Sequence, residues 1–532
     1  MLRIANLRVA LEDVAPLELL AARRLKLPVE AVEQTTIIRR AIDARRKHAI
    51  HFVYTLNVRV RSNEERVINR LRGDRDVSIF APPVREPMVV GSQPLTDRPV
   101  VVGAGPSGLL AALTLAEQGY KPLLLERGQD VDTRTRDIAD FWSTGRLNEA
   151  SNVQFGEGGA GTFSDGKLTT RVNDPRMEQV LELLVEHGAP PEIRYLHKPH
   201  IGTDRLRAVV KSLRCRIQDL GGTVEFGARI TDIEITGSQL SHITVNGDRK
   251  ISCQVLLLAI GHSARDTYAM LHRRGLALEA KAFAIGVRIE HPQELIDQAQ
   301  YGPAAGHPRL GAADYALVFQ DRIGQRTAYS FCMCPGGQVV AAASEAGGLV
   351  TNGMSHYSRA SGIANSAVVV GVQPSDWGGS DLGGVEFQRR WERLAFTLGG
   401  GDYTAPVQTV GDFLTGRSGG VSSLLSGSYR PEVKSADLHQ TLPDYVTASL
   451  ARALPDFGRR IRGFDHPGAL MTGVETRTSS PVRLLRGNDF QSVSHEGIYP
   501  LGEGAGYAGG IMSAALDGLN GALAVISRYR PF

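Results

Sequence analysis

The feature that most constrains this chain is a glycine-rich turn between two short apolar runs. Val100–Val102 precedes the pattern Gly103-x-Gly105-x-x-Gly108, a stretch of small residues follows, and a second apolar run ends at Glu126. This order predicts strand, turn, helix, strand and acid, which is the first unit of a fold that binds an ADP-containing dinucleotide. The glycines would allow the tight turn, the approach of the pyrophosphate and close helix packing, and the carboxylate would bind the ribose.

The neighbours of the turn belong to the same predicted site. Pro106 and Ser107 open the helix, and the free N–H groups and positive dipole end of a helix N-terminus favour phosphate. Arg127 directly follows the acid. We therefore include these three residues among those expected to contact the cofactor.

Three later segments favour a flavin over a nicotinamide cofactor. Residues 155–168 form a run of small residues that can lie along a flat ring system, and residues 255–263 form an apolar strand ending in Ala-x-Gly. Residues 498–511 bring an acid that can bind a ribityl chain and a helix N-terminus that can face the pyrimidine end of the isoalloxazine. The prediction is non-covalent FAD, with further contacts from Gly158, Gly159, Gly161, Thr162, Gly166, Lys167, Leu168, Ala259, Gly261, Gly502, Glu503, Gly509, Gly510 and Ile511.

With these segments in place, the chain resembles the glutathione-reductase-like FAD superfamily and, more narrowly, the uncharacterised bacterial FAD-dependent dehydrogenases. The resemblance extends over nearly the full length and includes Cys332-Met-Cys-Pro-Gly-Gly337 and Thr351-Asn-Gly-Met354. It implies a FAD fold with an attached N-terminal α+β domain, and it implies no particular substrate. The chain departs from the pattern at Glu503, where many superfamily members have Asp.

The expected fold class is α/β, with a Rossmann-like FAD-binding domain of glutathione-reductase type, an inserted mixed-sheet α+β domain and an N-terminal α+β domain. We expect the N-terminal module at 1–80, a proline-containing linker at 81–97, the first part of the FAD-binding domain at 98–264, the inserted substrate domain at 265–465 and the C-terminal part of the FAD-binding domain at 466–532.

The source of electrons stays open at this stage. A pyridine-nucleotide-disulfide reductase would carry a second GxGxxG and a CxxxxC or CxxC pair, and the sequence has neither. Electrons would therefore come from an organic substrate, from a protein electron-transfer partner, or from NAD(P)H acting as a transient donor without a Rossmann domain of its own.

No residue is assigned as catalytic, but five side chains are candidates. His262 could contact the cofactor or donate a proton, Arg288 could clamp a carboxylate, and Asn352 could line the substrate cavity. On a regular strand Cys332 and Cys334 would share one face. Four of them have a structural alternative: a helix cap for His262, a salt-bridged strand end for Arg288, and small buried hydrophobes for the two cysteines.

Charge and composition narrow the partners and the compartment. The net charge of +4 does not by itself imply nucleic acid, and the basic run at 39–48 is better explained as a solvated face than as an RNA contact. We expect no metal site, no signal peptide and no membrane span. Four cysteines are too few for a disulfide framework, which favours the cytoplasm.

The preferred function is a FAD-dependent oxidoreductase that moves a hydride or two electrons between flavin N5 and an unidentified small-molecule substrate. One alternative is a flavin-dependent reductase of polyprenoid or other alkene bonds, which an apolar tunnel would favour. Another is an RNA- or protein-binding module that uses FAD structurally. A small polar cavity with Arg288 pointing inward would instead favour an amino- or hydroxy-acid-like substrate.

Overall fold

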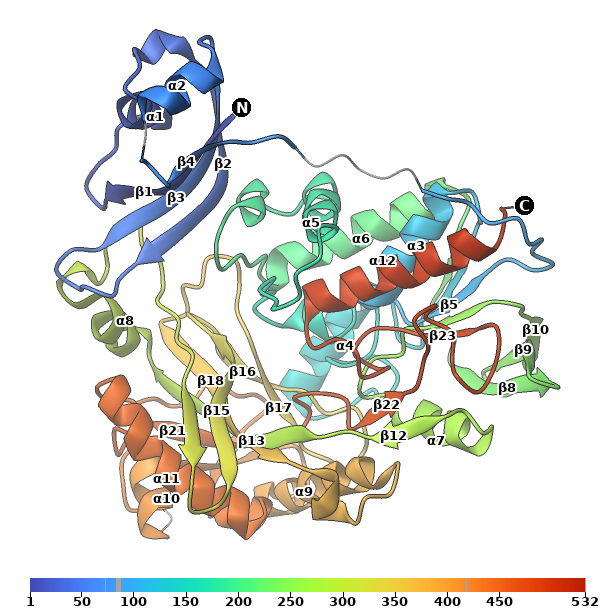
Figure 1. The fold of residues 1–532 in the computed structure, drawn as a ribbon. Helices are drawn as coiled ribbons and strands as arrows, with labels where there is room; N and C mark the ends of the chain where they lie inside the picture. Colours follow the sequence, from blue (N-terminus) through green and yellow to red (C-terminus); the bar gives the residue numbers. More distant parts are fainter. Residues whose placement is uncertain (72, 83–87, 418, 532) are drawn as a thin grey trace.

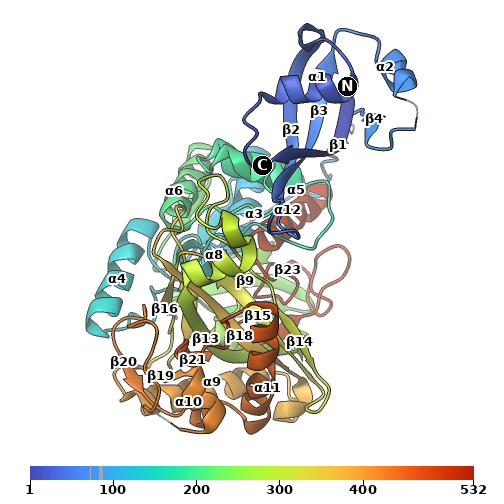
Figure 2. The same ribbon diagram turned by 90° about the vertical axis from the view of Figure 1, so that its left-hand side faces the viewer.

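The structure is a computed structural model that describes residues 1–71, 73–82, 88–417 and 419–531. Residues 83–87 of the predicted linker lie outside the described residues. The N-terminal module stands at one end of the molecule, the nucleotide-binding domain lies in the middle and the second domain lies at the other end (Figures 1 and 2).

The N-terminal module is a twisted antiparallel sheet with strand order β2-β3-β1-β4, with helices beside it. The strands are rich in β-branched and aromatic residues, and alternate side chains of β3 are buried, as expected for a sheet with one face on a core. Asn63 caps α2 by accepting a hydrogen bond from the Arg66 N–H. The elements are β1 (Leu2–Ala10), α1 (Leu17–Leu25), β2 (Val32–Asp43), β3 (His51–Val60), α2 (Glu64–Arg70) and β4 (Val77–Ile79).

The nucleotide-binding domain is built on a parallel sheet with strand order β23-β11-β5-β6-β7. The middle strands are short and wholly apolar because helices and a small β-meander cover both faces. One face carries α3, α6 and α12, which share one hydrophobic core. The strands are β5 (Val100–Val102), β6 (Leu123–Leu125), β7 (Thr223–Glu225), β11 (Leu256–Leu258) and β23 (Ile498–Pro500), and the helices are α3 (Pro106–Glu117), α4 (Val131–Thr144), α5 (Met177–Glu186), α6 (Thr203–Asp219), α7 (Arg265–Arg273) and α12 (Ile511–Arg528).

The meander over the other face consists of β8 (Ile230–Thr236), β9 (Gln239–Val245) and β10 (Arg249–Ser252). Each pairs antiparallel with the next, and their apolar side chains pack in one cluster with those of the parallel sheet. The architecture is therefore a mixed α/β fold with a Rossmann-like nucleotide-binding domain.

The second domain contains a large mixed sheet with strand order β14-β15-β18-β13-β21-β19-β20, in which only the pairing of β19 with β20 is parallel among the described strands. Nearly all of β13 is buried, because it pairs on both sides and lies under α8 and α11. The strands are β13 (Phe283–Pro292), β14 (Val318–Asp321), β15 (Arg326–Cys334), β18 (Ile363–Val372), β19 (Ala405–Thr409), β20 (Val433–Ser435) and β21 (Leu470–Glu475), and the helices are α8 (Gln293–Tyr301), α9 (Gly383–Gly399), α10 (Val410–Thr415) and α11 (Asp444–Arg460).

Strand β21 lies beyond residue 465, where we expected the inserted domain to end, yet it pairs with β13 and β19 inside this sheet. The chain then returns to the nucleotide-binding domain beside its outward path, since β12 (Leu278–Ala280) pairs antiparallel with β22 (Val482–Leu484). A separate ladder joins β16 (Gln338–Ala341) to β17 (Thr351–Met354) and brings residue 352 under the large sheet.

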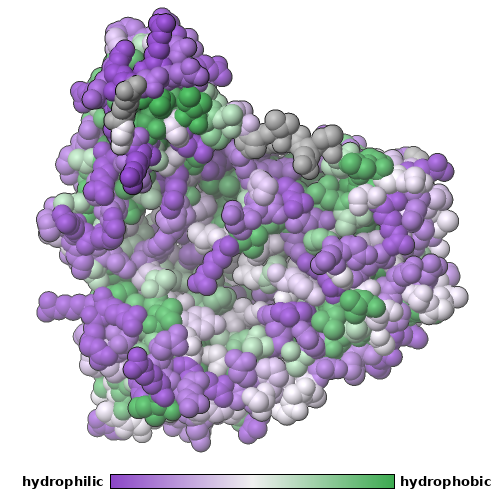
Figure 3. Space-filling model, viewed as in Figure 1, coloured by the Kyte–Doolittle hydropathy of each residue, from purple (hydrophilic) through white to green (hydrophobic). Residues whose placement is uncertain are grey.

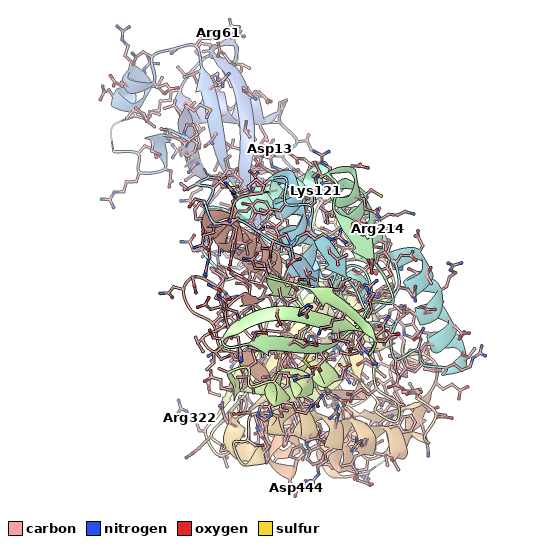
Figure 4. The ribbon with its side chains drawn as sticks, turned by 90° about the vertical axis from the view of Figure 1, so that its right-hand side faces the viewer. Asp13, Arg61, Lys121, Arg214, Arg322 and Asp444 are labelled. Carbon is pink, nitrogen blue, oxygen red and sulfur yellow. The ribbon has the colours of Figure 1, made fainter. Side chains whose placement is uncertain are left out.

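The N-terminal module contacts both other parts. The backbone of Arg40 in β2 exchanges hydrogen bonds with Tyr195 and His197, at 2.7 and 2.9 Å. Arg309 donates to the carbonyls of Leu11 and Asp13. In Figure 4, Asp13 lies near the junction and Arg61 at the far end of the module, while Lys121 and Arg214 lie on the nucleotide-binding domain and Arg322 and Asp444 at the opposite end of the molecule. The surface is hollowed beneath the projecting module (Figure 3).

Candidate functional site

A cavity of about 340 Å³ opens at the carboxyl ends of β5, β11 and β23. This is the edge at which parallel α/β sheets bind ligands. We call it the glycine-lined cavity, because its walls include residues predicted from the glycine patterns: Gly103, Gly105, Pro106, Ser107, Glu126, Gly159, Gly161, Gly166, Lys167, Ala259, Gly261, Gly502, Glu503, Gly509, Gly510 and Ile511. The second domain closes it with Phe331, Cys332, Asn352, Glu475, Arg477 and Thr478.

The first glycine turn has the geometry that the sequence predicts. Gly103 has a φ of 100°, in the left-handed region. A Cβ on Gly108 would lie 1.8 Å from the Gly103 carbonyl oxygen, so this glycine sets the close packing of α3 on the turn and does not line the cavity. A Cβ on Gly105 would face Gly159, 3.8 Å from its Cα. A larger side chain there would extend into the space at the N-terminus of α3.

Glu126 is 5 % exposed and organises the loops around the cavity. Its carboxylate accepts hydrogen bonds from the N–H groups of Ala104, Gly128 and Gly156, at 2.7, 2.9 and 2.9 Å. It also lines the cavity, so a ribose hydroxyl is within its reach. Arg127 does not line the cavity: it forms a bidentate ion pair with Asp266 and lies over the ring of Phe155.

Three more predicted contacts lie outside the cavity wall. Gly158 donates its N–H to the Ala104 carbonyl, and a Cβ there would lie 2.0 Å from the Thr162 hydroxyl. Thr162 accepts a hydrogen bond from Thr203 through its carbonyl. Leu168 donates its N–H to the Pro199 carbonyl. These contacts tie the segment 155–168 to the first glycine turn and to Pro199 and Thr203.

The C-terminal segment supplies an acid and a helix N-terminus. Burial raises the pKa of Glu503 to about 7, against the attraction of nearby Lys281. Burial also lowers the pKa of His262 to about 3, assisted by Arg477, so the imidazole is neutral at physiological pH. The Nδ1 atom of His262 lies 3.8 Å from the Glu503 carboxylate. Both side chains line the cavity and can hydrogen-bond to a bound polyhydroxyl chain or ring.

Open space and unpaired polar atoms in this cavity fit FAD. A Cβ on Gly509 or Gly510 would meet nothing within 4 Å, although both residues precede the N-terminus of α12. The Ser107 hydroxyl and Nε2 of His262 are buried without a hydrogen-bond partner among the described residues. A dinucleotide supplies hydrogen-bonding groups for both atoms and a pyrophosphate for the N-terminus of α3.

Arg288 follows the structural alternative, a buried salt bridge on its strand, and does not point into the cavity as a carboxylate clamp. It is fully buried, and its five N–H donors go to both oxygens of Glu475, to Asn365, to Asn352 and to the Cys332 carbonyl. Within the described part of the chain, no donor is left for a substrate. Burial opposes its charge, but the Glu475 carboxylate raises the pKa of Arg288, so the pair is ionic. Arg288 therefore positions three residues that line the cavity.

The two cysteines also differ from the expectation of a regular strand. A bulge interrupts β15 between Phe331 and Cys334, and Cys332 has a φ of 45°. Cys332 lines the cavity, whereas Cys334 is fully buried behind it and does not. The Cys334 thiol donates to the Cys332 carbonyl at 3.4 Å.

Contact with the Cys334 thiol lowers the pKa of Cys332 to about 5, against burial and with the help of Arg288 and Lys167. The same contact and burial raise the pKa of Cys334. The nearby cations Arg288 and Lys167 favour a thiolate at the more accessible Cys332, and burial disfavours one at Cys334.

A second cavity, of about 700 Å³, lies beneath the N-terminal module. We call it the adjoining cavity, because Lys167, Thr169 and Cys332 line it as well as the glycine-lined cavity. Its other walls are Ile38, Arg39 and Thr55 of the module, residues 168, 170, 181 and 193–199 of the nucleotide-binding domain and residues 314–316, 330, 333 and 359 of the second domain. Arg39, Arg194, Lys198 and Arg359 make this lining cationic, and Asp314 is the acid among the residues that line it.

Sequence reasoning missed the wall that the second domain supplies at residues 475–478. Arg477 is held by Glu392, which also pairs with Arg265 of the nucleotide-binding domain. The only local signal was the polar run Glu-Thr-Arg-Thr after a buried apolar strand.

No cluster of three or more side chains suited to a metal ion occurs in the described residues. No helix that the structure describes is long and apolar enough to cross a membrane.

The fold and the glycine-lined cavity define a protein that binds a dinucleotide on a Rossmann-like domain. A model described as "FAD-dependent protein, C-terminal domain-like" matches residues 282–478, a NAD(P)-binding Rossmann-like domain matches 101–155, and a domain of unknown function matches 1–59. An uncharacterized protein of Clostridium beijerinckii is 50% identical over 530 residues, 99% of each chain. The chain belongs to the family of this relative, its residues 282–478 form a domain of FAD-dependent proteins, and its cofactor is FAD.

Solved flavoproteins are more distant. CtdE in complex with FAD is 14% identical, with 79% of this chain and 82% of that chain covered and a TM-score of 0.32. A flavoprotein/dehydrogenase from Cytophaga hutchinsonii is 13% identical, with 80% and 77% covered and a TM-score of 0.34. Likeness at this level carries no argument about the reaction.

Proposed function

We propose that the protein is a FAD-dependent oxidoreductase that moves two electrons between flavin N5 and a small organic substrate held in the adjoining cavity. The observation that carries this proposal is the wall shared by the glycine-lined cavity and the adjoining cavity, formed by Lys167, Thr169 and Cys332. A substrate in the adjoining cavity would be in reach of a cofactor in the glycine-lined one. The glycine turn and the acid at 126 support a FAD site of glutathione-reductase type.

When bound, FAD supplies the two-electron chemistry at N5. The protein supplies binding and orientation. The N-terminus of α3 and Gly105 would hold the pyrophosphate, Glu126 holds the surrounding loops, and Glu503 would accept a hydrogen bond from the ribityl chain. The neutral His262 can hydrogen-bond through Nε2 without adding a charge.

The charges of the adjoining cavity support an anionic substrate. Burial opposes the charge of Lys167, but Asp165 at 3.2 Å raises its pKa, so the ammonium group stays protonated in the shared wall. Lys198 pairs with Asp314 at 2.7 Å, and Arg39 contacts only the imidazole of His197 among the hydrogen bonds of the described residues. Arg194 pairs with Glu182, and Arg359 shares the Asp165 carboxylate with Lys167. A carboxylate or phosphate entering beneath the module would therefore meet Arg39 and two cations that share a single acid.

The alternatives from the sequence have less support. A polyprenoid or alkene reductase needs an extended apolar tunnel, and the adjoining cavity carries charged residues on each of its walls. A module that binds RNA through residues 39–48 needs free cations, but Arg45 is bidentate to Asp43 and Arg39 faces the cavity. NAD(P)H or a protein electron-transfer partner stays open for the other half-reaction. Free thiols at Cys215, Cys253, Cys332 and Cys334 support a cytoplasmic location.

The test is the spectrum of the purified protein and its anaerobic reduction. We expect a yellow protein that releases about one FAD per chain on heat denaturation and whose flavin absorbance bleaches on reduction with dithionite. A colourless protein that takes up no FAD on reconstitution would contradict the proposal. A bound flavin that resists reduction would favour the structural use of FAD.

A further inference from the structure

The shared wall contains one side chain that can itself carry electrons. Of Lys167, Thr169 and Cys332, only the cysteine can be oxidised and reduced under mild conditions. It is partly exposed, and it borders both the cofactor and the space beneath the N-terminal module. A thiol at this place touches whatever passes between the cavities.

A second thiol lies directly behind it. The bulge in β15 and the left-handed backbone of Cys332 turn this residue out of the strand, while Cys334 stays buried with its Sγ 3.4 Å from the Cys332 carbonyl oxygen. The two thiols also interact with each other, and this contact is the largest influence on the ionisation of both. One residue separates the two cysteines, so a disulfide between them would close a small ring within residues 332–334.

The surroundings favour one thiolate and one thiol. The Arg288 guanidinium holds the Cys332 carbonyl at 2.9 Å, and Lys167 lies in the same wall. Both cations favour the Cys332 thiolate, while the buried Cys334 keeps its proton. A thiolate that is accessible to an incoming disulfide, with a buried thiol to resolve the mixed disulfide, is the arrangement that thiol–disulfide exchange requires.

On the basis of the proposed function, we propose that Cys332 and Cys334 form a redox-active pair that exchanges two electrons with FAD and is reached, through the adjoining cavity, by a dithiol or disulfide substrate. In the oxidative direction the two thiols lose two electrons and two protons and form a Cys332–Cys334 disulfide, and FAD becomes FADH₂. A substrate dithiol then reduces this disulfide by exchange at Cys332 and leaves as its own disulfide.

The other cysteines provide the matched controls. Cys215 is exposed and Cys253 is buried, and neither lines the glycine-lined or the adjoining cavity. Burial raises the pKa of Cys253, so it is a poor nucleophile. A redox role should therefore be lost in Cys332→Ser and Cys334→Ala and kept in Cys215→Ser.

The first experiment counts electrons in the FAD-loaded protein, oxidised with ferricyanide and then titrated anaerobically with dithionite. The wild type and Cys215→Ser should take up about four electrons per FAD, two for the flavin and two for the disulfide, whereas Cys332→Ser and Cys334→Ala should take up about two. Wild-type uptake of two electrons would overturn the thiol pair and leave the oxidoreductase intact, whereas flavin that does not bleach at all would contradict the proposed function itself.

If a variant fails to fold, alkylation of the wild-type cysteines tests whether Cys332 and Cys334 form a disulfide. When the protein is unfolded in guanidinium before alkylation, mass spectrometry should find Cys332 and Cys334 blocked and Cys215 alkylated after ferricyanide, and all three alkylated after dithionite. Full alkylation of the pair in the oxidised protein would overturn the proposal.

The second experiment uses dihydrolipoate, a dithiol with a carboxylate. It should bleach the wild-type flavin anaerobically and act at least about tenfold more slowly on Cys332→Ser. Equal rates of flavin bleaching in the wild type and in Cys332→Ser would overturn the claim that a dithiol substrate reacts at Cys332.

Discussion

The glycine-lined cavity and the adjoining cavity share a wall but are built in different ways. The first is lined mainly by glycines, backbone groups and strand ends of one domain, each within a short stretch of sequence. The second is lined by side chains from the N-terminal module, the nucleotide-binding domain and the second domain. Cofactor recognition is therefore local in the sequence, whereas substrate recognition depends on how distant parts pack. The cofactor could be inferred from motifs, and the substrate could not.

The strongest test of this contrast is Arg288→Met, which removes the side chain that supports the shared wall from behind. It leaves Glu475 buried without its partner and frees Asn352 and the Cys332 carbonyl. Breaking a buried ion pair from one side costs about 3–5 kcal/mol, and we expect that loss in the free energy of unfolding measured with urea. Arg288→Met/Glu475→Met should recover much of it. A loss below about 1 kcal/mol would show that the network does not hold the wall.

Gly105→Val tests the cavity built from backbone. The valine methyl groups would extend from a Cβ that faces Gly159 into the expected pyrophosphate site, and we expect FAD affinity to fall about 100-fold or more. Flavin fluorescence during reconstitution measures it. The control is Gly371→Val in β18, where a Cβ meets only a backbone oxygen at 4.0 Å outside both cavities. Wild-type affinity in Gly105→Val would place the pyrophosphate elsewhere.

Ile38→Trp tests the cavity built from side chains. The larger ring should fill space beneath the module and slow the alkylation of Cys332 by N-ethylmaleimide about tenfold, followed by tandem mass spectrometry. FAD affinity should stay within about threefold of the wild type, because no residue of the module lines the glycine-lined cavity. Arg61→Trp, at the far end of the module, should change neither quantity. Unchanged labelling in Ile38→Trp would show that Cys332 is reached by another path.

Glu503→Gln has the smallest expected effect and a defined pH dependence. The folded pKa of Glu503 is about 7, raised from 4.5 by burial, so the folded apoprotein binds this proton more tightly than the unfolded chain does. The stability that this bound proton gives the folded apoprotein is therefore lost as the pH rises from 4.5 through about 7. Between about pH 5 and pH 8 the apoprotein of Glu503→Gln should gain about 1–2 kcal/mol over the wild type in urea unfolding, whereas the exposed Glu496→Gln should gain none. A pH-independent difference would contradict the assigned pKa.

The N-terminal module supplies a related prediction. We expect a chain without it to keep FAD, provided that the chain begins ahead of residue 91. Gly91 and Gln93 donate their N–H groups to the carbonyls of Ile526 and Arg528 at the end of α12. A chain starting at Met88 keeps these bonds. It should bind FAD within about threefold of the full chain, by fluorescence titration, and expose Cys332 to faster alkylation. A flavin-free product would make the module part of the FAD fold.

The sequence predicted the parts that depend on neighbouring residues. The turn at Gly103, the packing role of Gly108 and the start of α12 after Gly510 each follow from a few adjacent positions. The boundary at 465 could not account for β21, because its place between β13 and β19 depends on strands more than fifty residues away in the chain.

The same reasoning separates the candidate site residues. Arg288 follows an apolar pattern on β13 and its charge suggested a substrate, but its partners come from β15, β17, β18 and β21, which no local pattern reveals. The CxC spacing predicted a shared face for Cys332 and Cys334, and a bulge replaced the regular strand. The adjoining cavity could not be predicted at all, because it exists only where the module docks.

The central claim is that the flavin ring meets the wall shared by the two cavities, and a crystal structure of the FAD-loaded protein tests it most directly. We predict that the isoalloxazine lies within about 4 Å of Lys167, Thr169 or Cys332, with N5 facing the adjoining cavity. A ring that points away from this wall, with the three residues out of contact, would contradict the account.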